Sequence, residues 1–231
     1  MTPRPIVIVM VKAPVPGTVK TRLVPSLTAD SAAALAAAFV QDAVRNARQI
    51  ADVLIAYSPA EGNLLLESLL PDGLHWTAQR GNNLGERMGA AMADAAASGF
   101  SPLVVIGTDS PTLPPEHITE AIQTLQAGIA DVVLGPAEDG GYYLVGARQP
   151  QPGLFSSVAW STEAALTQTA ANAARLNLRC HLLPAWHDVD TVEDLARLRR
   201  ESEEDTAACA RVPATAAWMQ GFLAENSCTS P

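Results

Sequence analysis

Short apolar runs alternate along this chain with longer stretches of helical periodicity. The run at 6–11 (IVIVMV) is rich in β-branched residues, and the run at 103–106 (LVVI) is similar. Between such runs, alanine-rich stretches such as 28–50 place apolar side chains at helical spacing. Strands that alternate with helices form βαβ units, and continuously apolar strands are typical of buried parallel sheets. The sequence therefore predicts an α/β fold with a mostly parallel twisted sheet and helices on both faces.

The expected elements cover most of the chain. Further strands are expected at 53–57, 75–78, 132–134, 142–145 and 179–183, and further helices at 61–70, 84–97, 162–176 and 192–200. A length of 231 residues suits one large α/β domain, which we expect to span residues 1–200. Residues 201–231, which contain Trp218 and Phe222, are expected to form a helical tail that packs on this domain or is partly frayed.

The chain is acidic, with 24 Asp and Glu residues against 15 Lys and Arg, and its net charge is −9 at pH 7. This charge disfavours nucleic acid as a partner, because phosphate backbones attract basic surfaces. Any phosphate group that the protein binds must therefore meet a few well-placed cations, backbone N–H groups or a metal ion.

The cysteines and the length of the apolar runs predict a cytoplasmic location. Cys180, Cys209 and Cys228 are scattered and form no C-x-x-C pair, which argues against a disulfide framework and a zinc site. No apolar run approaches the ~20 residues of a membrane span, and the first run lacks the cleavage site of a signal peptide. We therefore expect a soluble protein with reduced thiols and no membrane partner.

Ligands of open α/β sheets bind beyond the carboxyl ends of the strands, so the segments that follow the apolar runs are informative. The first is 12–23 (KAPVPGTVKTRL), a stiff loop that contains Lys12, Lys20 and Arg22. Cations on a rigid loop can grip phosphate oxygens, which predicts an anion site. The loop is not a Walker A motif, because Val19 stands where that motif needs glycine. The alternative is an ordinary solvated loop.

Asp109 follows the run at 103–106 closely and is a candidate metal ligand. Mg²⁺ usually takes one or two protein carboxylates together with phosphate oxygens of a substrate. Asp188 and Asp190 project to the same side if their segment is extended, and one of them can complete the site with Asp109. The alternatives are an Asx turn at Asp109 and a helix cap at Asp190 or Thr191.

A glycine pair marks the segment 135–144 (GPAEDGGYYL). Glu138 and Asp139 precede Gly140 and Gly141, and the two glycines let the backbone approach a ligand closely. A plain hairpin turn is the alternative, because Asp-Gly is also a strong turn signal.

The segment 80–88 (RGNNLGERM) is a weaker signal at the start of a helix. Glycines at a helix N-terminus, here Gly81 and Gly85, can admit a nucleobase or a phosphate to free N–H groups. The four histidines share no ligand spacing, and we expect them to be structural except His187, which is adjacent to the acidic pair Asp188 and Asp190.

Taken together, these segments resemble the bacterial selenodomain-associated transferase family, which is glycosyltransferase-like. That family lies within the nucleotide-diphospho-sugar transferase superfamily and is similar to the molybdenum cofactor and 2-phospho-lactate guanylyltransferases. The resemblance covers residues 12 to about 198 and implies a Rossmann-like GT-A fold. It rests on the segments KAPVPGTVKTRL, GNNLGERM, GTDSPTLP, GPAEDGGYYLVG and HDVDTVEDLARL.

The resemblance also implies roles for single residues. A nucleotide would lie over the first loop, with its phosphates near Gly17, Lys20 and Arg22. Asp109 would be the metal-bridging aspartate, and Asp190 or Asp188 would be the second ligand of Mg²⁺ or Mn²⁺. We expect a catalytic set of Lys20, Arg22, Asp109 and Asp139, and a nucleotide-binding set of Lys12, Pro14, Gly17, Gly85, Arg87, Gly140 and Gly141. One departure is Asn83, where the family usually has an acidic residue, and it affects contacts to the base or the ribose.

Two reactions fit these residues. In nucleotidyl transfer, a small phosphorylated or hydroxyl acceptor attacks the α-phosphate of a nucleoside triphosphate, and the basic loop after the first strand suits the triphosphate. In glycosyl transfer the donor is a nucleoside-diphosphate sugar, and Glu138 or Asp139 acts as a base or orients the sugar. A nucleotide-binding protein without turnover is a third hypothesis, which the number of carboxylates disfavours.

Overall fold

The protein is a seven-stranded α/β domain with a helical C-terminal segment, described by a computed structural model over residues 4–24 and 26–227. The sheet has the order β3-β2-β1-β4-β6-β5-β7, in which β6 is antiparallel to both neighbours and the other pairs are parallel. The mostly parallel sheet predicted from the apolar runs is confirmed. The strands are β1 (Arg4–Lys12), β2 (Asp52–Ser58), β3 (His75–Ala78), β4 (Phe100–Ile106), β5 (Val132–Pro136), β6 (Tyr142–Ala147) and β7 (Cys180–Leu182).

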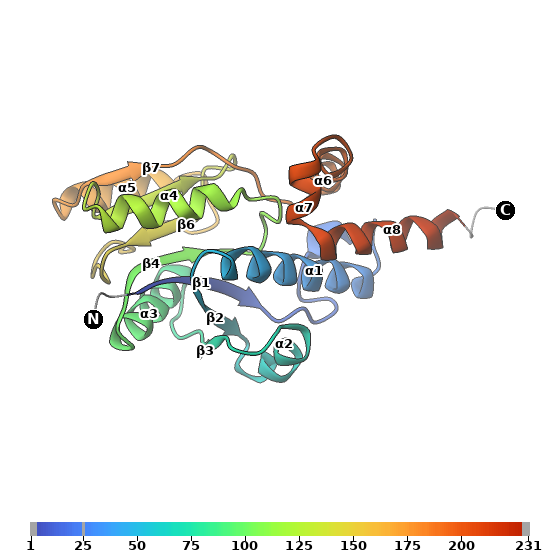
Figure 1. The fold of residues 1–231 in the computed structure, drawn as a ribbon, viewed down its shortest axis with the longest axis horizontal. Coiled ribbons are helices and arrows are strands. Elements are labelled where there is room, and N and C mark those ends of the chain that lie inside the picture. The colour runs from blue at the N-terminus through green and yellow to red at the C-terminus, as the bar shows by residue number, and fades with distance from the viewer. Residues whose placement is uncertain (1–3, 25, 228–231) are drawn as a thin grey trace.

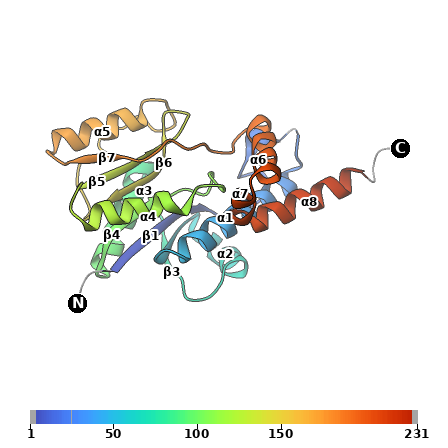
Figure 2. The ribbon, with the colours of Figure 1, turned by 45° about the horizontal axis from the view of Figure 1, so that its top comes forward.

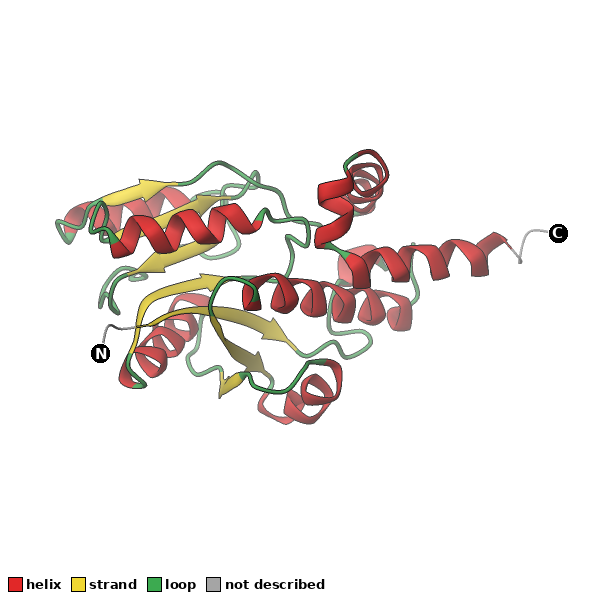
Figure 3. Ribbon diagram, viewed as in Figure 1, coloured by secondary structure: helices red, strands yellow, loops and turns green. Residues whose placement is uncertain are grey.

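Helices cover both faces of the sheet, as predicted (Figures 1 and 3). The side chains of β1 alternate between the faces, because successive residues of a strand point to opposite sides. Val7, Val9 and Val11 join the core under one set of helices, whereas Ile6 and Ile8 join the core under the other. The first set is α1 (Ala29–Arg48), α2 (Asn63–Leu69) and α4 (Pro115–Gln126), and the second is α3 (Leu84–Ala97) and α5 (Ala165–Arg175).

Three further helices follow the last strand: α6 (Val192–Glu204), α7 (Thr206–Arg211) and α8 (Pro213–Ser227). Short 3₁₀ turns, η1 (Thr21–Leu23) and η2 (Ala60–Gly62), complete the elements. In Figures 1 and 2 these C-terminal helices lie at the end of the sheet toward which β1 points, and α8 runs beside α1. Trp218 of α8 packs into an apolar cluster with Leu23 and Leu35.

A buried carboxylate joins α8 to α1. Asp42 is 0% exposed and accepts hydrogen bonds from the backbone N–H groups of Ala214 and Thr215, each at 2.9 Å, and from the Thr215 hydroxyl at 2.7 Å. These donors belong to the first turn of α8, where a helix has no partners of its own for its N–H groups. Asp42 therefore supplies the cap that fixes the start of this helix.

Two of the three cysteines, Cys180 and Cys209, are free thiols at exposed positions, and Cys228 lies outside the described residues. None of the helices in the described part of the chain combines the length and the apolar character that a membrane crossing requires.

Candidate functional site

A pocket of about 500 Å³ opens at the carboxyl ends of the parallel strands. The register of the sheet brings these ends together, because β1 pairs with β2 as far as Lys12–Ser58 and with β4 as far as Val9–Ile106. The loops that leave β1 and β4 therefore form neighbouring walls of the pocket, and the segment before α6 contributes Asp188 and Asp190 to its lining. This is the edge at which open α/β sheets bind ligands.

The predicted residues divide into two groups. Those that line this pocket are Lys12, Lys20, Arg22, Arg87, Asp109, Asp188 and Asp190. Those that are not among its lining residues are Pro14, Gly17, Gly85, Asp139, Gly140 and Gly141. The first group contains every predicted metal ligand and all of the predicted cations, so the charged part of the predicted site comes together in space.

The cations of the first loop differ in their surroundings. Arg22 has a side chain that is 74% exposed, with one guanidinium nitrogen 3.5 Å from Asp190 Oδ2. Lys12 donates a hydrogen bond to the carbonyl oxygen of Thr18 at 2.7 Å. Lys20, in contrast, has a side chain that is only 6% exposed and pairs with both Asp109 and Asp190. Arg22 and Lys12 are therefore accessible to an anion in the pocket, whereas Lys20 is enclosed.

A small apolar cluster holds the two walls of the pocket together. Leu23, from the loop after β1, and Val189, from the segment before α6, are both 0% exposed and pack with Phe39 of α1. The backbone N–H of Val189 also donates to the carbonyl oxygen of Asp109 at 2.8 Å. Asp109 thereby lies next to the segment that carries Asp190.

The segment before α6 presents its aspartates to the pocket because a different residue caps the helix. Thr191 accepts a hydrogen bond from the N–H of Asp194, and the Asp194 carboxylate accepts one from the Thr191 N–H at 2.8 Å. This reciprocal pair is a capping box. Asp188 and Asp190 are therefore free of the capping role and line the pocket.

Asp188 lines the pocket together with Asp109 and Asp190 and accepts a hydrogen bond from the hydroxyl of Ser110. Burial, together with the charges of Asp109, Asp139 and Asp190, raises the pKa of the Asp188 carboxyl to about 6, although the Ser110 hydrogen bond opposes the shift. The folded protein therefore retains a proton on Asp188 that the unfolded chain releases at lower pH. Ionisation of Asp188 in the ligand-free protein costs stability, and this cost is complete above about pH 6.

Replacing Asp188 by Asn should therefore stabilise the ligand-free protein at neutral pH. Since a shift from 3.8 to about 6 corresponds to at most about 3 kcal/mol, we expect a gain of about 2 kcal/mol at about pH 8. The gain should fall to about half near pH 5 and vanish below about pH 4, where the carboxyl is protonated in both states. Urea unfolding at several pH values measures this dependence.

Asp131→Asn provides a control of opposite sign. The guanidinium of Arg179 holds the pKa of the Asp131 carboxyl down at about 2, so this carboxylate stabilises the folded state once ionised. Its replacement should lower stability at neutral pH. An Asp188→Asn gain that is the same near pH 5 as near pH 8 would contradict the raised pKa.

The donor set fits a hard divalent cation. Asp109 and Asp190 have side chains that are 52% and 42% exposed, and with Asp188 they offer carboxylate oxygens to one pocket. Across residues 4–24 and 26–227, no three His, Cys, Asp or Glu side chains are grouped closely enough to hold a metal ion. Since Mg²⁺ binds through one or two carboxylates plus phosphates and water, two of these aspartates are sufficient.

The glycine pair after β5 forms a turn beside the pocket. Asp139 accepts a hydrogen bond from the N–H of Gly141 at 2.8 Å, as in an Asx turn. Gly140 has a φ of +85°, and a Cβ there would lie 2.5 Å from the backbone of Glu163. The turn therefore requires glycine for its own packing, and it places the Asp139 charge close enough to Asp188 to affect the Asp188 pKa.

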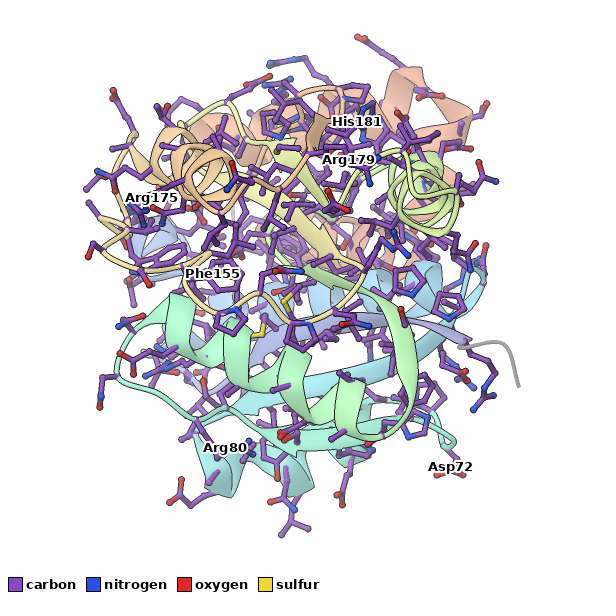
Figure 4. The ribbon with its side chains drawn as sticks, turned by 90° about the vertical axis from the view of Figure 1, so that its left-hand side faces the viewer. Asp72, Arg80, Phe155, Arg175, Arg179 and His181 are labelled. Carbon is purple, nitrogen blue, oxygen red and sulfur yellow. The ribbon has the colours of Figure 1, made fainter. Side chains whose placement is uncertain are left out.

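Helix α3 begins with a tight packing contact. A Cβ on Gly85 would lie 2.6 Å from the ring of Trp160 and 2.7 Å from Cβ of Phe155, which Figure 4 shows against α3. Gly85 therefore admits the loop that carries these aromatic rings. Asn83 caps the helix by accepting a hydrogen bond from the N–H of Glu86 at 3.0 Å. Gly85 and Arg87 are the two residues of this segment that we expected to bind the nucleotide. Of these two, Arg87 lines the pocket.

Sequence reasoning missed several lining residues. Ser110 follows Asp109 directly, so its proximity to the predicted metal site was readable from the sequence. The position of Gln79 in the pocket could not be predicted in this way. Gln79 follows β3 and donates hydrogen bonds to the carbonyl oxygens of Val11 and Ala56, which belong to neighbouring strands. Tyr142 enters the pocket because β6 is antiparallel and therefore begins at the edge where the other strands end.

Solved structures of other proteins share this architecture. A protein from Desulfovibrio desulfuricans G20, provisionally assigned as a nucleotide-diphospho-sugar transferase, is 34% identical, and the match covers 96% of this chain and 99% of that one with a TM-score of 0.82. CMP:2-keto-3-deoxy-manno-octonic acid synthetase, complexed with CTP, is 10% identical over 87% of this chain and 99% of its own, with a TM-score of 0.52. The 4-diphosphocytidyl-2C-methyl-D-erythritol synthase of Anaerococcus prevotii DSM 20548 is 8% identical over 84% and 96%, with a TM-score of 0.55.

The fold is thus the Rossmann-like fold of the nucleotide-sugar transferase type. The chain belongs to the family described as "Uncharacterized protein conserved in bacteria (DUF2064)", which matches residues 40–162. A search of curated proteins gives no match.

Proposed function

We propose that this protein is a nucleotidyltransferase that uses a divalent metal ion. It would transfer a nucleotidyl group from a nucleoside triphosphate to a small phosphorylated or hydroxyl acceptor. The observation that carries this proposal is the pocket at the carboxyl edge of the sheet, in which Lys12 and Arg22 are gathered together with Asp109, Asp188 and Asp190. Cations for phosphate oxygens and carboxylates for a metal ion thereby occur side by side in an otherwise acidic protein.

Each group has a task in this reaction. Arg22 and Lys12 bind phosphate oxygens, and the planar guanidinium of Arg22 can do so through two hydrogen bonds. Asp109, with Asp188 or Asp190, would hold Mg²⁺ or Mn²⁺. The bound ion would neutralise the negative charge that develops on the leaving pyrophosphate. The acceptor oxygen forms a bond to the α-phosphorus as the bond to pyrophosphate breaks. Positioning of the two substrates supplies much of the remaining rate enhancement.

Glycosyl transfer from a nucleoside-diphosphate sugar is the second candidate. The 34% identical protein from Desulfovibrio desulfuricans G20 is provisionally assigned as a nucleotide-diphospho-sugar transferase, which favours this candidate. The turn after β5 carries the two carboxylates that could act as the base in glycosyl transfer. The Glu138 carboxylate is paired with Arg197, at 2.8 and 3.1 Å, whereas among the described residues the Asp139 carboxylate accepts only the hydrogen bond of its own turn. Asp139 is therefore the better placed of the two to accept a proton from an acceptor.

A thermal-unfolding panel separates the candidates. The protein is heated with Mg²⁺ or Mn²⁺ and, in turn, each nucleoside triphosphate and several nucleoside-diphosphate sugars. A ligand at a hundredfold excess over its Kd stabilises the folded state by about 2.7 kcal/mol, which gives a clear shift. We expect a metal-dependent shift with one triphosphate, together with pyrophosphate release when the acceptor is present. A shift with diphosphate sugars alone favours glycosyl transfer, and no shift with any donor contradicts both.

A further inference from the structure

The ammonium group of Lys20 is surrounded by oxygen atoms. It donates to the carbonyl oxygen of Val189 at 2.7 Å and to Asp190 Oδ1 at 3.1 Å, and it also contacts Asp109 Oδ1. A lysine ammonium has three hydrogens to donate, and these three oxygens account for all of them. The ring of Phe39 lies beneath, with its centroid 5.2 Å from the nitrogen.

The backbone of the loop is arranged to aim this side chain inward. Lys20 has φ 46° and ψ 37°, in the left-handed region that residues other than glycine and asparagine rarely adopt. Strained backbone of this kind persists where surrounding contacts hold it, and it concentrates at functional sites. Lys12 and Arg22, on the same loop, point their charges to more open surroundings.

The contacts of Lys20 also offset the repulsion between the carboxylates of Asp109 and Asp190. Asp109 and Asp190 come from different segments, and two carboxylates brought together without a cation repel each other. The ammonium neutralises part of this charge and joins the end of β4 to the segment before α6. It does so through the Oδ1 atom of each aspartate, so another cation that approaches these carboxylates meets the positive charge of the ammonium.

We propose that Lys20 is the internal counter-ion of the Asp109–Asp190 pair, and that it keeps divalent cations weakly bound in the absence of a nucleotide. The ammonium already offsets the negative charge that would attract a metal ion to these carboxylates, and the two positive charges repel each other. Phosphate groups bring the negative charge that offsets this repulsion, so metal and nucleotide bind with positive coupling. The inference rests on the metal dependence of the proposed function and adds the reason why the metal binds together with its nucleotide.

Mn²⁺ binding without nucleotide tests this inference directly. The electron paramagnetic resonance signal of free Mn²⁺ measures its Kd for the wild-type protein and for Lys20→Gln. We expect the variant to bind Mn²⁺ at least about tenfold more tightly, a coupling of ordinary size. Lys12→Gln is the matched control, because it removes the same charge from the same pocket without touching either aspartate. It should change the Kd by less than about threefold, since charges further from the metal are screened by solvent.

Thermal unfolding provides a second readout that does not depend on activity. Without metal, Lys20→Gln should unfold at a lower temperature than wild type, because its aspartates lack their counter-ion. Addition of Mn²⁺ should restore most of the lost unfolding temperature of Lys20→Gln and should change the unfolding temperature of the wild-type protein much less. Equal or weaker Mn²⁺ binding by Lys20→Gln overturns the inference, as does a variant that stays unfolded in millimolar Mn²⁺.

A failure of the proposed function would give a different experimental result from a failure of this inference. If neither protein binds Mn²⁺, with or without a nucleoside triphosphate, metal dependence itself is wrong, and the inference falls with it. If both bind Mn²⁺ with the same affinity and the triphosphate tightens both equally, metal dependence stands and only the counter-ion role of Lys20 is overturned.

Discussion

Replacement of Asp109 by Asn should reduce transfer activity by roughly a thousandfold while leaving the fold intact. The carboxylate of Asp109 lines the pocket at the tip of β4 and is half-exposed, so it is available to hold the metal ion that would neutralise the charge developing on pyrophosphate. Asparagine has the same shape but no charge, and the loss of one metal ligand removes several kcal/mol of stabilisation from the transition state. Pyrophosphate release with the donor identified by the unfolding panel measures the effect.

The fold should tolerate this substitution. The amide oxygen of asparagine can still accept from Lys20, and the backbone carbonyl at position 109 still accepts from Val189. Asp131→Asn is the matched control, because Asp131 precedes β5 and pairs with Arg179 at the amino end of the sheet, on the face shown in Figure 4. It should retain nearly full activity. Activity of Asp109→Asn within about tenfold of wild type would contradict the role of Asp109 as a metal ligand.

The second large effect concerns stability. Asp42→Ala should lower the free energy of unfolding by about 3 kcal/mol, because it leaves the N–H groups of Ala214 and Thr215 and the Thr215 hydroxyl without their acceptor. Burial raises the pKa of the Asp42 carboxyl, so part of this gross loss is offset by the removal of a desolvated group. Urea unfolding measures the difference.

Loss of this cap should also release α8. Limited proteolysis should cut Asp42→Ala near Pro213 much faster than wild type, because the start of the helix no longer has its anchor. Asp42→Asn keeps one acceptor oxygen and should lose about half as much stability. Equal stability of the wild type and Asp42→Ala would show that the apolar contacts of Trp218 hold the helix without Asp42.

Local sequence signals predicted the secondary structure closely. The strand expected at 75–78 and the helix expected at 84–97 have the bounds of β3 and α3. Helix α1 begins after Thr28, within the stretch expected to be helical, and the Thr28 hydroxyl accepts a hydrogen bond from the N–H of Ser31. These features depend on neighbours in the chain: apolar periodicity, capping hydroxyls and prolines act within a few residues, so they can be read without knowledge of the fold.

The location of the pocket was predictable for a related reason. Parallel strands end at the same edge of a sheet, so the segments after 6–11 and 103–106 had to lie near each other once the sheet was parallel. The chemistry of those segments then indicated cations beside carboxylates. The glycines were harder to interpret. Gly85 and Gly140 attract attention as ligand contacts, but their surroundings are Trp160 and the backbone of Glu163. A glycine in a sequence does not reveal which atom approaches it.

The sequence by itself therefore determined the α/β class, the order of the elements and the edge of the sheet that carries the site, because each follows from local pattern and from the rules of parallel sheets. The tertiary structure decided which charges meet. Lys20 and Arg22 are two residues apart and look alike in the sequence, yet one is enclosed by Asp109 and Asp190 and the other is open to solvent. Burial and long-range pairing set the behaviour of a charged group, and both depend on segments far apart in the chain.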